Sequence, residues 1–217
     1  MKAFDYDPTD VQARIIYRDD SIVVANKPPG LLSVPGRLPA LGDCLLTRLL
    51  AEFSDLLLVH RLDMDTSGAM VFARTKAAQR DLSMQFEKRV VRKTYLARVH
   101  GRVTGYSGAI DLPLAADWPN RPLQKICEER GKDSLTKWRI IRRSAPSSLV
   151  MLQPKTGRSH QLRVHMQAIG HPVLGDRFYG LADGKNRLML HAWRLRFRHP
   201  VNHCLVGFTA RDYFGFT

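Results

Sequence analysis

One stretch of the sequence concentrates residue types that could do chemistry: His60-Arg61-Leu62-Asp63-Met64-Asp65-Thr66-Ser67-Gly68. It contains two carboxylates, an imidazole, a guanidinium and a turn-forming glycine. The apolar runs on either side, 56–59 and 69–72, are typical of buried strands, so the polar residues are expected in a loop at the end of a sheet. Loops held by rigid strands often carry catalytic residues. The same composition also suits an ordinary polar turn, and the rest of the chain has to decide between the two.

Other chemistries fit this sequence poorly. His160 and His165 are five residues apart, unlike the i, i+4 histidine pair of zinc proteases. A Ser-His-Asp triad would use Ser67, His60 and Asp63, but the Gly-x-Ser-x-Gly pattern is absent. Neither the Walker nor the dinucleotide-binding glycine pattern occurs. We therefore expect no metal and no cofactor.

The chain is strongly basic. Lys and Arg number 34 against 20 Asp and Glu, which gives a formal charge of +14. Such a charge favours a polyanionic partner, with nucleic acid as the first candidate and a basic surface that binds nothing as the alternative. A membrane surface is less favoured, because no basic amphipathic helix stands out and no apolar run approaches a membrane span.

Cysteine usage and the amino terminus indicate a reducing, cytoplasmic setting. Cys44, Cys127 and Cys204 are odd in number and far apart, which fits neither a disulfide framework nor a zinc motif, so we expect buried, reduced thiols. The first seven residues contain acids where a signal peptide needs an apolar core.

Hydrophobic periodicity predicts the elements that position the loop. Hairpins are expected at 14–17 with 22–25 and at 135–143 with 149–153, and further strands at 69–73, 95–99, 188–197 and 205–209. Helices are expected over 42–53 and 76–89, and from an N-cap at Ser159 to Gly170. No repeat, long linker or charge run divides the chain. We therefore expect a polar leader over 1–14 and one α+β domain with a mixed sheet over 15–217.

Three side chains outside the loop are placed where they could be structural or functional. Tyr95 shares one face of its strand with Ala97 and could belong to the core or to a site. Lys27, at a strand end, could contact phosphate or be solvated. Arg163 lies on the shoulder of a helical apolar stripe, near the core edge, where a guanidinium needs a carboxylate.

Four segments, in order, resemble the motifs of the RluA family of pseudouridine synthases. They are Asp20-Ser21-Ile22-Val23-Val24-Ala25-Asn26-Lys27-Pro28-Pro29-Gly30-Leu31, His60-Arg61-Leu62-Asp63-x-x-Thr66-Ser67-Gly68, Lys93-Thr94-Tyr95-Leu96-Ala97 and Gly157-Arg158-Ser159-His160-Gln161-Leu162-Arg163-Val164-His165. The resemblance runs from about residue 15 to the carboxy terminus. Each motif alone is moderately specific, and four in the right order make coincidence improbable. Further matches at 31–37, 112–122 and 175–179 resemble the compact, dual-specificity members of that family.

The resemblance implies a fold and an activity. The fold would be that of a pseudouridine synthase, with a mixed, mostly antiparallel central sheet flanked by helices and loops and an active-site cleft across the sheet. No S4-type RNA-binding domain is expected before residue 15. The activity would be that of an isomerase, an intramolecular transferase that acts on uridines of 23S rRNA and of tRNA anticodon stem-loops. We expect a monomer with RNA as its partner and no membrane association.

The resemblance also assigns roles to residues. Asp63 would be the catalytic carboxylate, Arg163 its ion-pair partner, and Tyr95 the side chain that stacks on the uracil. The target uridine must be flipped out of its stack, and Arg61 is the candidate to fill the vacated space. His60 would orient the loop or contact substrate, and Asp65 is read as loop-forming. The matching motifs add as substrate-binding candidates Lys93, Asn120, Arg121, Arg158 and His160.

Two alternatives remain open from the residues alone. A non-catalytic RNA-binding protein would explain the charge but not the carboxylate, tyrosine and arginine, and the aromatic signature of an RRM sheet is missing. A metal-dependent nuclease would need several converging carboxylates, and Asp63 with Asp65 makes a poor two-metal site.

Overall fold

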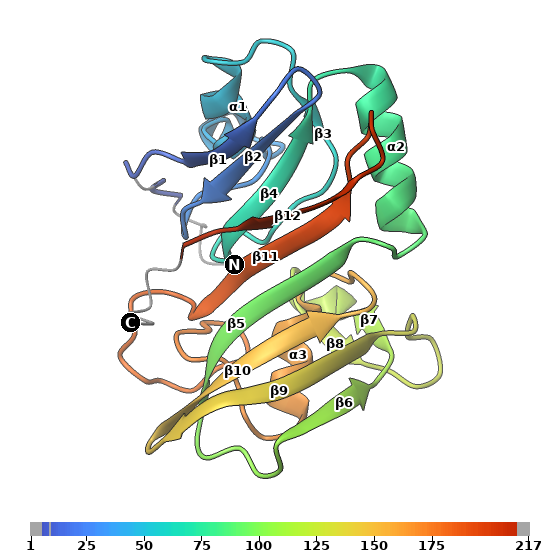
Figure 1. Ribbon diagram of the computed structural model, residues 1–217. Helices are drawn as coiled ribbons and strands as arrows, with labels where there is room; N and C mark the ends of the chain where they lie inside the picture. The colour runs from blue at the N-terminus through green and yellow to red at the C-terminus, as the bar shows by residue number, and fades with distance from the viewer. Residues whose placement is uncertain (1–5, 9, 212–217) are drawn as a thin grey trace. The chain divides into compact units, whose positions relative to one another are not determined.

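The computed structural model describes residues 6–8 and 10–211, which form two compact units. Of the described residues, unit 1 comprises those up to Val91 and those from Ala192 onward, and unit 2 comprises Arg92–His191. Of the predicted leader over 1–14, residues 1–5 and 9 lie outside the described residues. Each unit is described below by itself (Figure 1).

Unit 1 is built on a sheet with strands in the order β1, β2, β4 and β11. Their bounds are Arg14–Arg18 for β1, Ile22–Lys27 for β2, Ser67–Ala73 for β4 and Leu190–Arg198 for β11, which belongs to unit 1 from Ala192. β3 (Leu57–Leu58) pairs with β4, and β12 (Leu205–Thr209) pairs with β11. β2 and β4 are antiparallel, with Lys27 opposite Gly68. The end of β2 therefore lies beside the end of the His60 loop.

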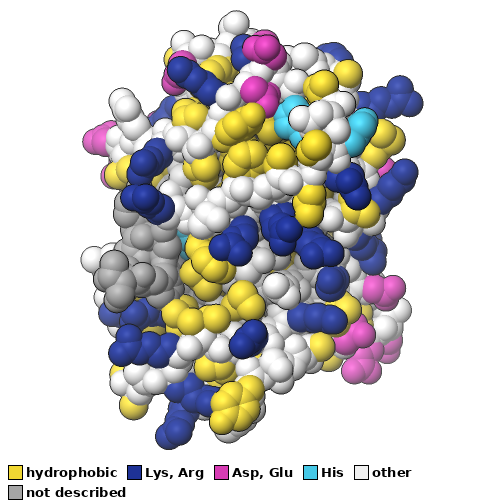
Figure 2. All heavy atoms as spheres, viewed as in Figure 1, with side chains coloured by type: hydrophobic (Ala, Val, Ile, Leu, Met, Phe, Trp, Pro, Cys, Tyr) yellow, Lys and Arg dark blue, Asp and Glu magenta, His cyan; other side chains and the backbone are white. Residues whose placement is uncertain are grey.

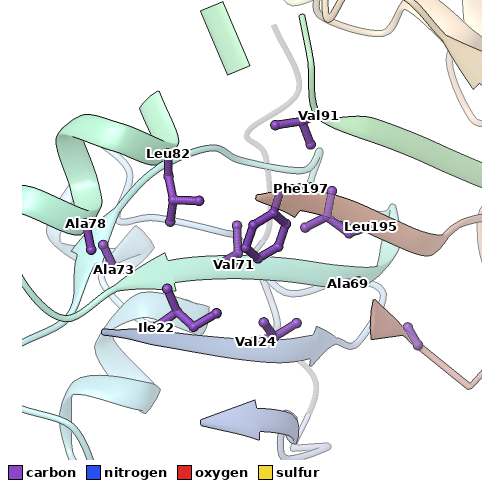
Figure 3. Packing of buried hydrophobic residues seen from close by; sticks show 11 residues of the cluster. Ile22, Val24, Ala69, Val71, Ala73, Ala78, Leu82, Val91, Leu195 and Phe197 are labelled. Carbon is purple, nitrogen blue, oxygen red and sulfur yellow. The ribbon is translucent and has the colours of Figure 1, made fainter. Parts of the chain in front are cut away.

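The core of unit 1 lies between this sheet and helix α2 (Lys76–Glu87). β2 and β4 are buried over their whole length, including the polar residues Asn26, Lys27 and Ser67 at their ends. Ala78 and Leu82 of α2 pack in one cluster with Ile22, Val71 and Phe197 of the sheet (Figure 3). Burial of each large aliphatic or aromatic side chain of this kind stabilises the fold by about 1.5–3 kcal/mol.

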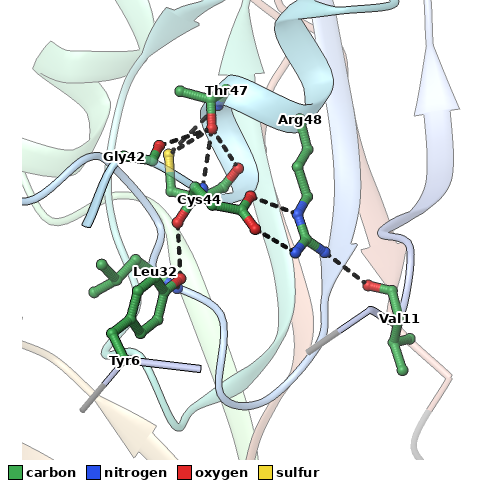
Figure 4. Close-up of polar contacts among 8 residues, drawn as sticks. Tyr6, Val11, Leu32, Gly42, Cys44, Thr47 and Arg48 are labelled. Atoms are coloured by element: carbon green, nitrogen blue, oxygen red, sulfur yellow. Dashed lines mark hydrogen bonds and ion pairs between the residues drawn. The ribbon is translucent and has the colours of Figure 1, made fainter. Parts of the chain in front are cut away.

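The segment before β1 is tied to the start of helix α1 (Leu45–Leu50), which is shorter than the helix predicted over 42–53. The Tyr6 hydroxyl donates to the Asp43 carbonyl at 2.8 Å and accepts from the Leu32 N–H at 3.0 Å (Figure 4). Arg48 binds the Asp43 carboxylate through two nitrogens, at 2.7 and 2.6 Å. The described part of the predicted leader is thus packed onto unit 1.

Unit 2 has an antiparallel sheet in the order β5, β10, β9 and β6, with helix α3 against it (Figure 1). The strands run over Arg92–His100 in β5, Ser147–Pro154 in β10, Leu135–Ser144 in β9 and Ser107–Asp111 in β6. α3 spans Gln161–Ala168, and its Leu162 and Met166 pack on the sheet. A separate hairpin of β7 (Leu114–Ala116) and β8 (Gln124–Ile126) packs on α3 through Leu114 and Ile126, which contact Val164.

The α+β fold class is confirmed, and several local predictions are corrected. α3 begins at Gln161 with His160 at the N-cap, so the N-cap predicted at Ser159 is wrong. Cys44 is buried as expected, but Cys127 is only partly buried and Cys204 is exposed; all three are free thiols. Within the described residues, no helix is both long and apolar enough to cross a membrane.

Candidate active site

The loop that carries Asp63 is anchored through its main chain. The Ser33 hydroxyl donates to the Leu62 carbonyl at 2.7 Å and accepts from the Leu62 N–H at 3.1 Å, and both residues are buried. The next turn closes where the Thr66 N–H donates to the Asp63 carbonyl at 3.1 Å. Asp63 and Asp65 are both half-buried on this turn. The sequence thus places a carboxylate on a short, rigid turn between β3 and β4.

Lys27 is a second anchor of the same loop. Its side chain is completely buried, and its ammonium donates to the carbonyl groups of Pro28, Leu31 and Met64 at 2.8, 2.6 and 2.7 Å. A buried ammonium requires such acceptors, because losing its hydration is costly. Lys27 is therefore neither solvated nor placed to contact phosphate, as the sequence had suggested it could be, and instead ties β2 to the loop.

His60 supports the loop from the other side. Its Nε2 accepts from the Val71 N–H at 3.1 Å, so Nδ1 carries the proton in the neutral ring, and the ring stacks on Phe86 with centroids 4.5 Å apart. These contacts favour the orienting role over substrate contact. Arg61, the neighbouring residue, is exposed and available to a ligand.

Gly68 allows the strand after the loop to lie close to its neighbour. Its φ is +120°, and a Cβ there would come within 2.3 Å of the Ala192 carbonyl oxygen. No other residue fits this position without moving the backbone. The glycine that made the stretch resemble a turn is thus required by the packing of β4 against β11.

In unit 2, the guanidinium of Arg163 is buried and paired with a carboxylate. Its Nε and one Nη donate to the two oxygens of Asp176 at 2.7 and 2.6 Å, and both side chains are at least 97% buried. Two main-chain N–H groups, of Phe178 and Tyr179, also donate to Asp176. Burial raises the pKa of Asp176, but the bonds from Arg163 and the main chain outweigh it and hold the pKa below its ordinary value.

Sequence reasoning correctly expected a carboxylate for Arg163 but did not identify Asp176. The two residues are 13 positions apart, and the available signal was the Gly175-Asp176 pair in a segment that matched the family. Arg163 makes further interactions besides this one. The expected pair between Arg163 and Asp63 would join the two units, and it stays a prediction.

Aromatic side chains surround Arg163 and connect it to His160. The guanidinium carbon lies 5.2 Å from the Phe178 ring centroid and 5.1 Å from that of Tyr179, distances suited to cation–π attraction. The Tyr179 hydroxyl accepts from the Gln124 N–H at 2.7 Å and lies 2.8 Å from Nδ1 of His160. His160 adopts a left-handed backbone conformation, with φ of 54°. Tyr179 therefore fixes the start of α3 against the β7–β8 hairpin.

The remaining predicted substrate-binding residues of unit 2 have structural contacts of their own. Lys93 donates to the Thr156 carbonyl at 3.0 Å, and Arg158 Nε donates to the Asp133 carbonyl at 3.3 Å. Tyr95, half-buried, packs with Ala97 against the core of unit 2, on the strand face that the alternation predicted.

Asn120 and Arg121 lie on the short helix η2 (Trp118–Asn120) and just after it. The Asn120 side chain donates to the Asp117 carboxylate at 2.8 Å, which closes the turn. The Arg121 guanidinium stacks over the Trp118 ring, 3.2 Å from its centroid. Both residues remain exposed to solvent.

The described surface is basic, and the two units provide three candidate polar groups. On the face drawn in Figure 2, Lys and Arg side chains predominate over Asp and Glu, in line with the charge of +14. Within residues 6–8 and 10–211, no three His, Cys, Asp or Glu side chains group in a way that could hold a metal ion. The groups that the units provide are a carboxylate on a rigid turn in unit 1 and a tyrosine and a paired guanidinium in unit 2.

Comparisons with known proteins agree on one family. Residues 21–168 match the family model described as RNA pseudouridylate synthase. The proteins named dual-specificity RNA pseudouridine synthase RluA from Vibrio vulnificus (strain CMCP6) and Escherichia coli (strain K12) are each 52% identical to this chain. The first match covers 91% of this chain and 82% of the relative, and the second covers 86% and 87%. A solved structure titled human RNA pseudouridylate synthase domain containing 1 aligns with a TM-score of 0.79 at 33% identity, over 95% of this chain and 86% of that one.

Proposed function

The chain belongs to the RNA pseudouridylate synthase family, and from this premise we propose that it isomerises uridine to pseudouridine in RNA with Asp63 as the catalytic carboxylate. The family match carries the proposal, because its span of 21–168 includes Asp63, Tyr95 and Arg163. The geometry of the turn that carries Asp63 also supports the proposal, because hydrogen bonds hold the turn in place. A non-catalytic RNA-binding protein would explain the charge but not the carboxylate, the tyrosine and the arginine together.

The reaction exchanges one bond between base and ribose for another. The bond between uracil N1 and ribose C1′ breaks, the base turns while it stays bound, and C5 bonds to C1′. The C5 proton leaves and N1 gains a proton, so the atoms balance. Ionised Asp63 either attacks C1′ or takes the proton from C2′, and both routes need the carboxylate charged.

Other residues act on the base and on the RNA. Tyr95 stacks on the uracil and assists the loss of the C5 proton, and Arg163 is the ion-pair partner of Asp63. The target nucleotide must leave its stack, at a cost of a few kcal/mol. Exposed Arg61, beside the turn, occupies the vacated space. The proposed substrates are 23S rRNA and tRNA anticodon stem-loops, for a monomeric enzyme in the cytoplasm.

The proposed function is tested with RNA that carries tritium at uracil C5. The protein is incubated with this RNA in the presence of a chelator, and both released label and strand length are measured. Isomerisation releases label to water and leaves the strand intact. Intact RNA that keeps its label would indicate a binding protein, and cleaved RNA would indicate a nuclease; either result would overturn the proposal.

A further inference from the structure

Unit 2 contains a cavity of about 740 Å³ next to the N-terminal end of α3. The β7–β8 hairpin, η2, the segment after β8 and residues 157–159 line it. Small-molecule sites commonly measure about 300–1,000 Å³, so one nucleotide fits this space. The lining side chains that bear on its chemistry are Trp118, Lys125, Glu129, Arg130, Lys132 and Arg158.

Trp118 displays its ring to solvent from a rigid turn. It is 67% exposed, although a tryptophan gains more than most residues from burial. Pro119 and the bond from Asn120 to Asp117 hold the turn, and the Arg121 guanidinium covers the ring. A preorganised, exposed aromatic ring backed by a cation is suited to stacking on a nucleic-acid base, which any of the four bases can provide.

The charge of the cavity is suited to phosphate. Its lining has four cationic side chains and one carboxylate, that of Glu129. Lys125 is paired with Asp117 at 3.4 Å, and Arg158 donates to a carbonyl. The side chains of Arg130 and Lys132 have no hydrogen bond or ion pair with any other residue that the structure describes. These two cations are therefore placed to neutralise a phosphodiester backbone.

The cavity is rigidly connected to the helix that carries Arg163. Gly157, Arg158 and Ser159 line it and lead directly into α3. Tyr179 joins the hairpin, through the Gln124 N–H, to His160 at the start of α3. A ligand in the cavity is therefore held at a fixed place relative to Arg163 within unit 2.

We propose that this cavity binds one unpaired nucleotide of the RNA substrate other than the target uridine, with its base on Trp118 and its phosphates at Arg130 and Lys132. The inference rests on the proposed function and adds to it a subsite that helps select which loop is modified. Single-stranded loops, whose bases are unstacked, are the part of RNA that proteins read in this way.

Substitution of Trp118 tests the stacking. Trp118→Ala is expected to weaken binding of an RNA stem-loop substrate about 5- to 150-fold, the usual cost of losing one base stack. KM rises accordingly, kcat stays within about twofold, and Trp118→Phe retains most of the affinity. Tyr106→Ala is the matched control, because Tyr106 is 81% exposed and also lies under an arginine, Arg143, but does not line the cavity. Unchanged binding by Trp118→Ala, or an equal loss in Tyr106→Ala, would overturn the subsite.

A scan of abasic positions identifies the nucleotide and separates the two proposals. With the wild-type protein, removing the base at one loop position should weaken binding, and Trp118→Ala should be insensitive to the same removal. If the wild-type enzyme is active but no loop position shows this difference between the wild type and Trp118→Ala, the subsite is overturned and the proposed function is not. Absence of C5-tritium release by the wild-type protein on every RNA would instead overturn the proposed function.

The phosphate contacts are tested by salt dependence. Arg130→Gln and Lys132→Gln should each reduce the slope of log affinity against log salt concentration by about 1. Lys137→Gln, on an exposed position of β9 away from the cavity, should leave the slope unchanged. Equal slopes in all three variants would contradict the proposed contacts of Arg130 and Lys132 with the RNA backbone.

Discussion

The two units hold their functional side chains in different ways. In unit 1, Ser33 and Lys27 bind the main chain of the loop at Leu62 and Met64, on either side of Asp63. In unit 2, Asp176 binds the guanidinium of Arg163 itself. A loop anchored through its main chain keeps its shape whichever side chain it presents. Replacing Asp63 should therefore leave the loop in place, whereas replacing Arg163 should also remove part of what stabilises its unit.

The largest loss of stability is expected from Arg163→Met. This change leaves Asp176 buried without its counter-charge, which typically costs about 3–5 kcal/mol of the free energy of unfolding. Urea denaturation measures it, with Arg18→Met as the control, because the Arg18–Glu52 pair is exposed and worth about 1 kcal/mol or less. Similar small losses in both variants would show that the pair is not an anchor of unit 2.

A somewhat smaller loss is expected from Lys27→Met, at about 3 kcal/mol. The methionine fills similar space but leaves the buried carbonyl groups of Pro28 and Leu31 and the half-buried one of Met64 without their donor. Lys88→Met, at an exposed position, should stay within about 0.5 kcal/mol of the wild type in the same urea titration. If Lys27→Met unfolds at the wild-type urea concentration, the loop does not depend on this anchor.

Ser33→Ala distinguishes the effect of loop position on kcat from the effect of a general loss of stability. Loss of the two hydrogen bonds to Leu62 should cost about 1–2 kcal/mol and lower kcat in the tritium assay, because the turn with Asp63 is less well fixed. The control is Ser148→Ala in unit 2, where an equally buried hydroxyl also donates to one main-chain group and accepts from another. It should lose similar stability at unchanged kcat. Equal kcat in both variants would contradict anchoring through Leu62.

The smallest effect is a pH dependence from His165. Burial lowers the pKa of this ring, which accepts from Thr136 and donates to the Leu112 carbonyl. The unfolded ring takes up a proton below its ordinary pKa of about 6.5, while the folded ring does not until lower pH, so the free energy of unfolding falls as pH drops through this window. His165→Gln should flatten that slope, and His203→Asn, at an exposed position, should not. An unchanged slope in His165→Gln would show that another group is responsible.

The sequence predicted the parts of the fold that depend on side-chain period. β2, β4, β9, β10 and α2 lie where alternation or helical spacing placed them. The strands β6 to β8 were not predicted, because they are short and the local sequence does not show which strands they pair with.

The sequence indicated which residues belong to the candidate site, but it did not indicate which groups they bind. The start of α3 was misplaced because the helix has His160 at its N-cap without a side-chain cap. The Gln161 side chain instead accepts from the Arg158 N–H and the Thr156 hydroxyl ahead of the helix. A glutamine in sequence is typical of a surface position, and nothing local shows that this one is buried. The same holds for Lys27, whose partners lie up to 37 residues away.

The central claim is that Asp63, and not its neighbour Asp65, carries the isomerisation. The direct test compares release of tritium from uracil C5 by Asp63→Asn and Asp65→Asn, with RNA affinity and thermal stability measured in parallel. We predict that Asp63→Asn lowers release by at least about 10²- to 10⁴-fold at unchanged affinity and stability, while Asp65→Asn remains active. Wild-type release by Asp63→Asn, with loss of release in Asp65→Asn, would contradict the assignment.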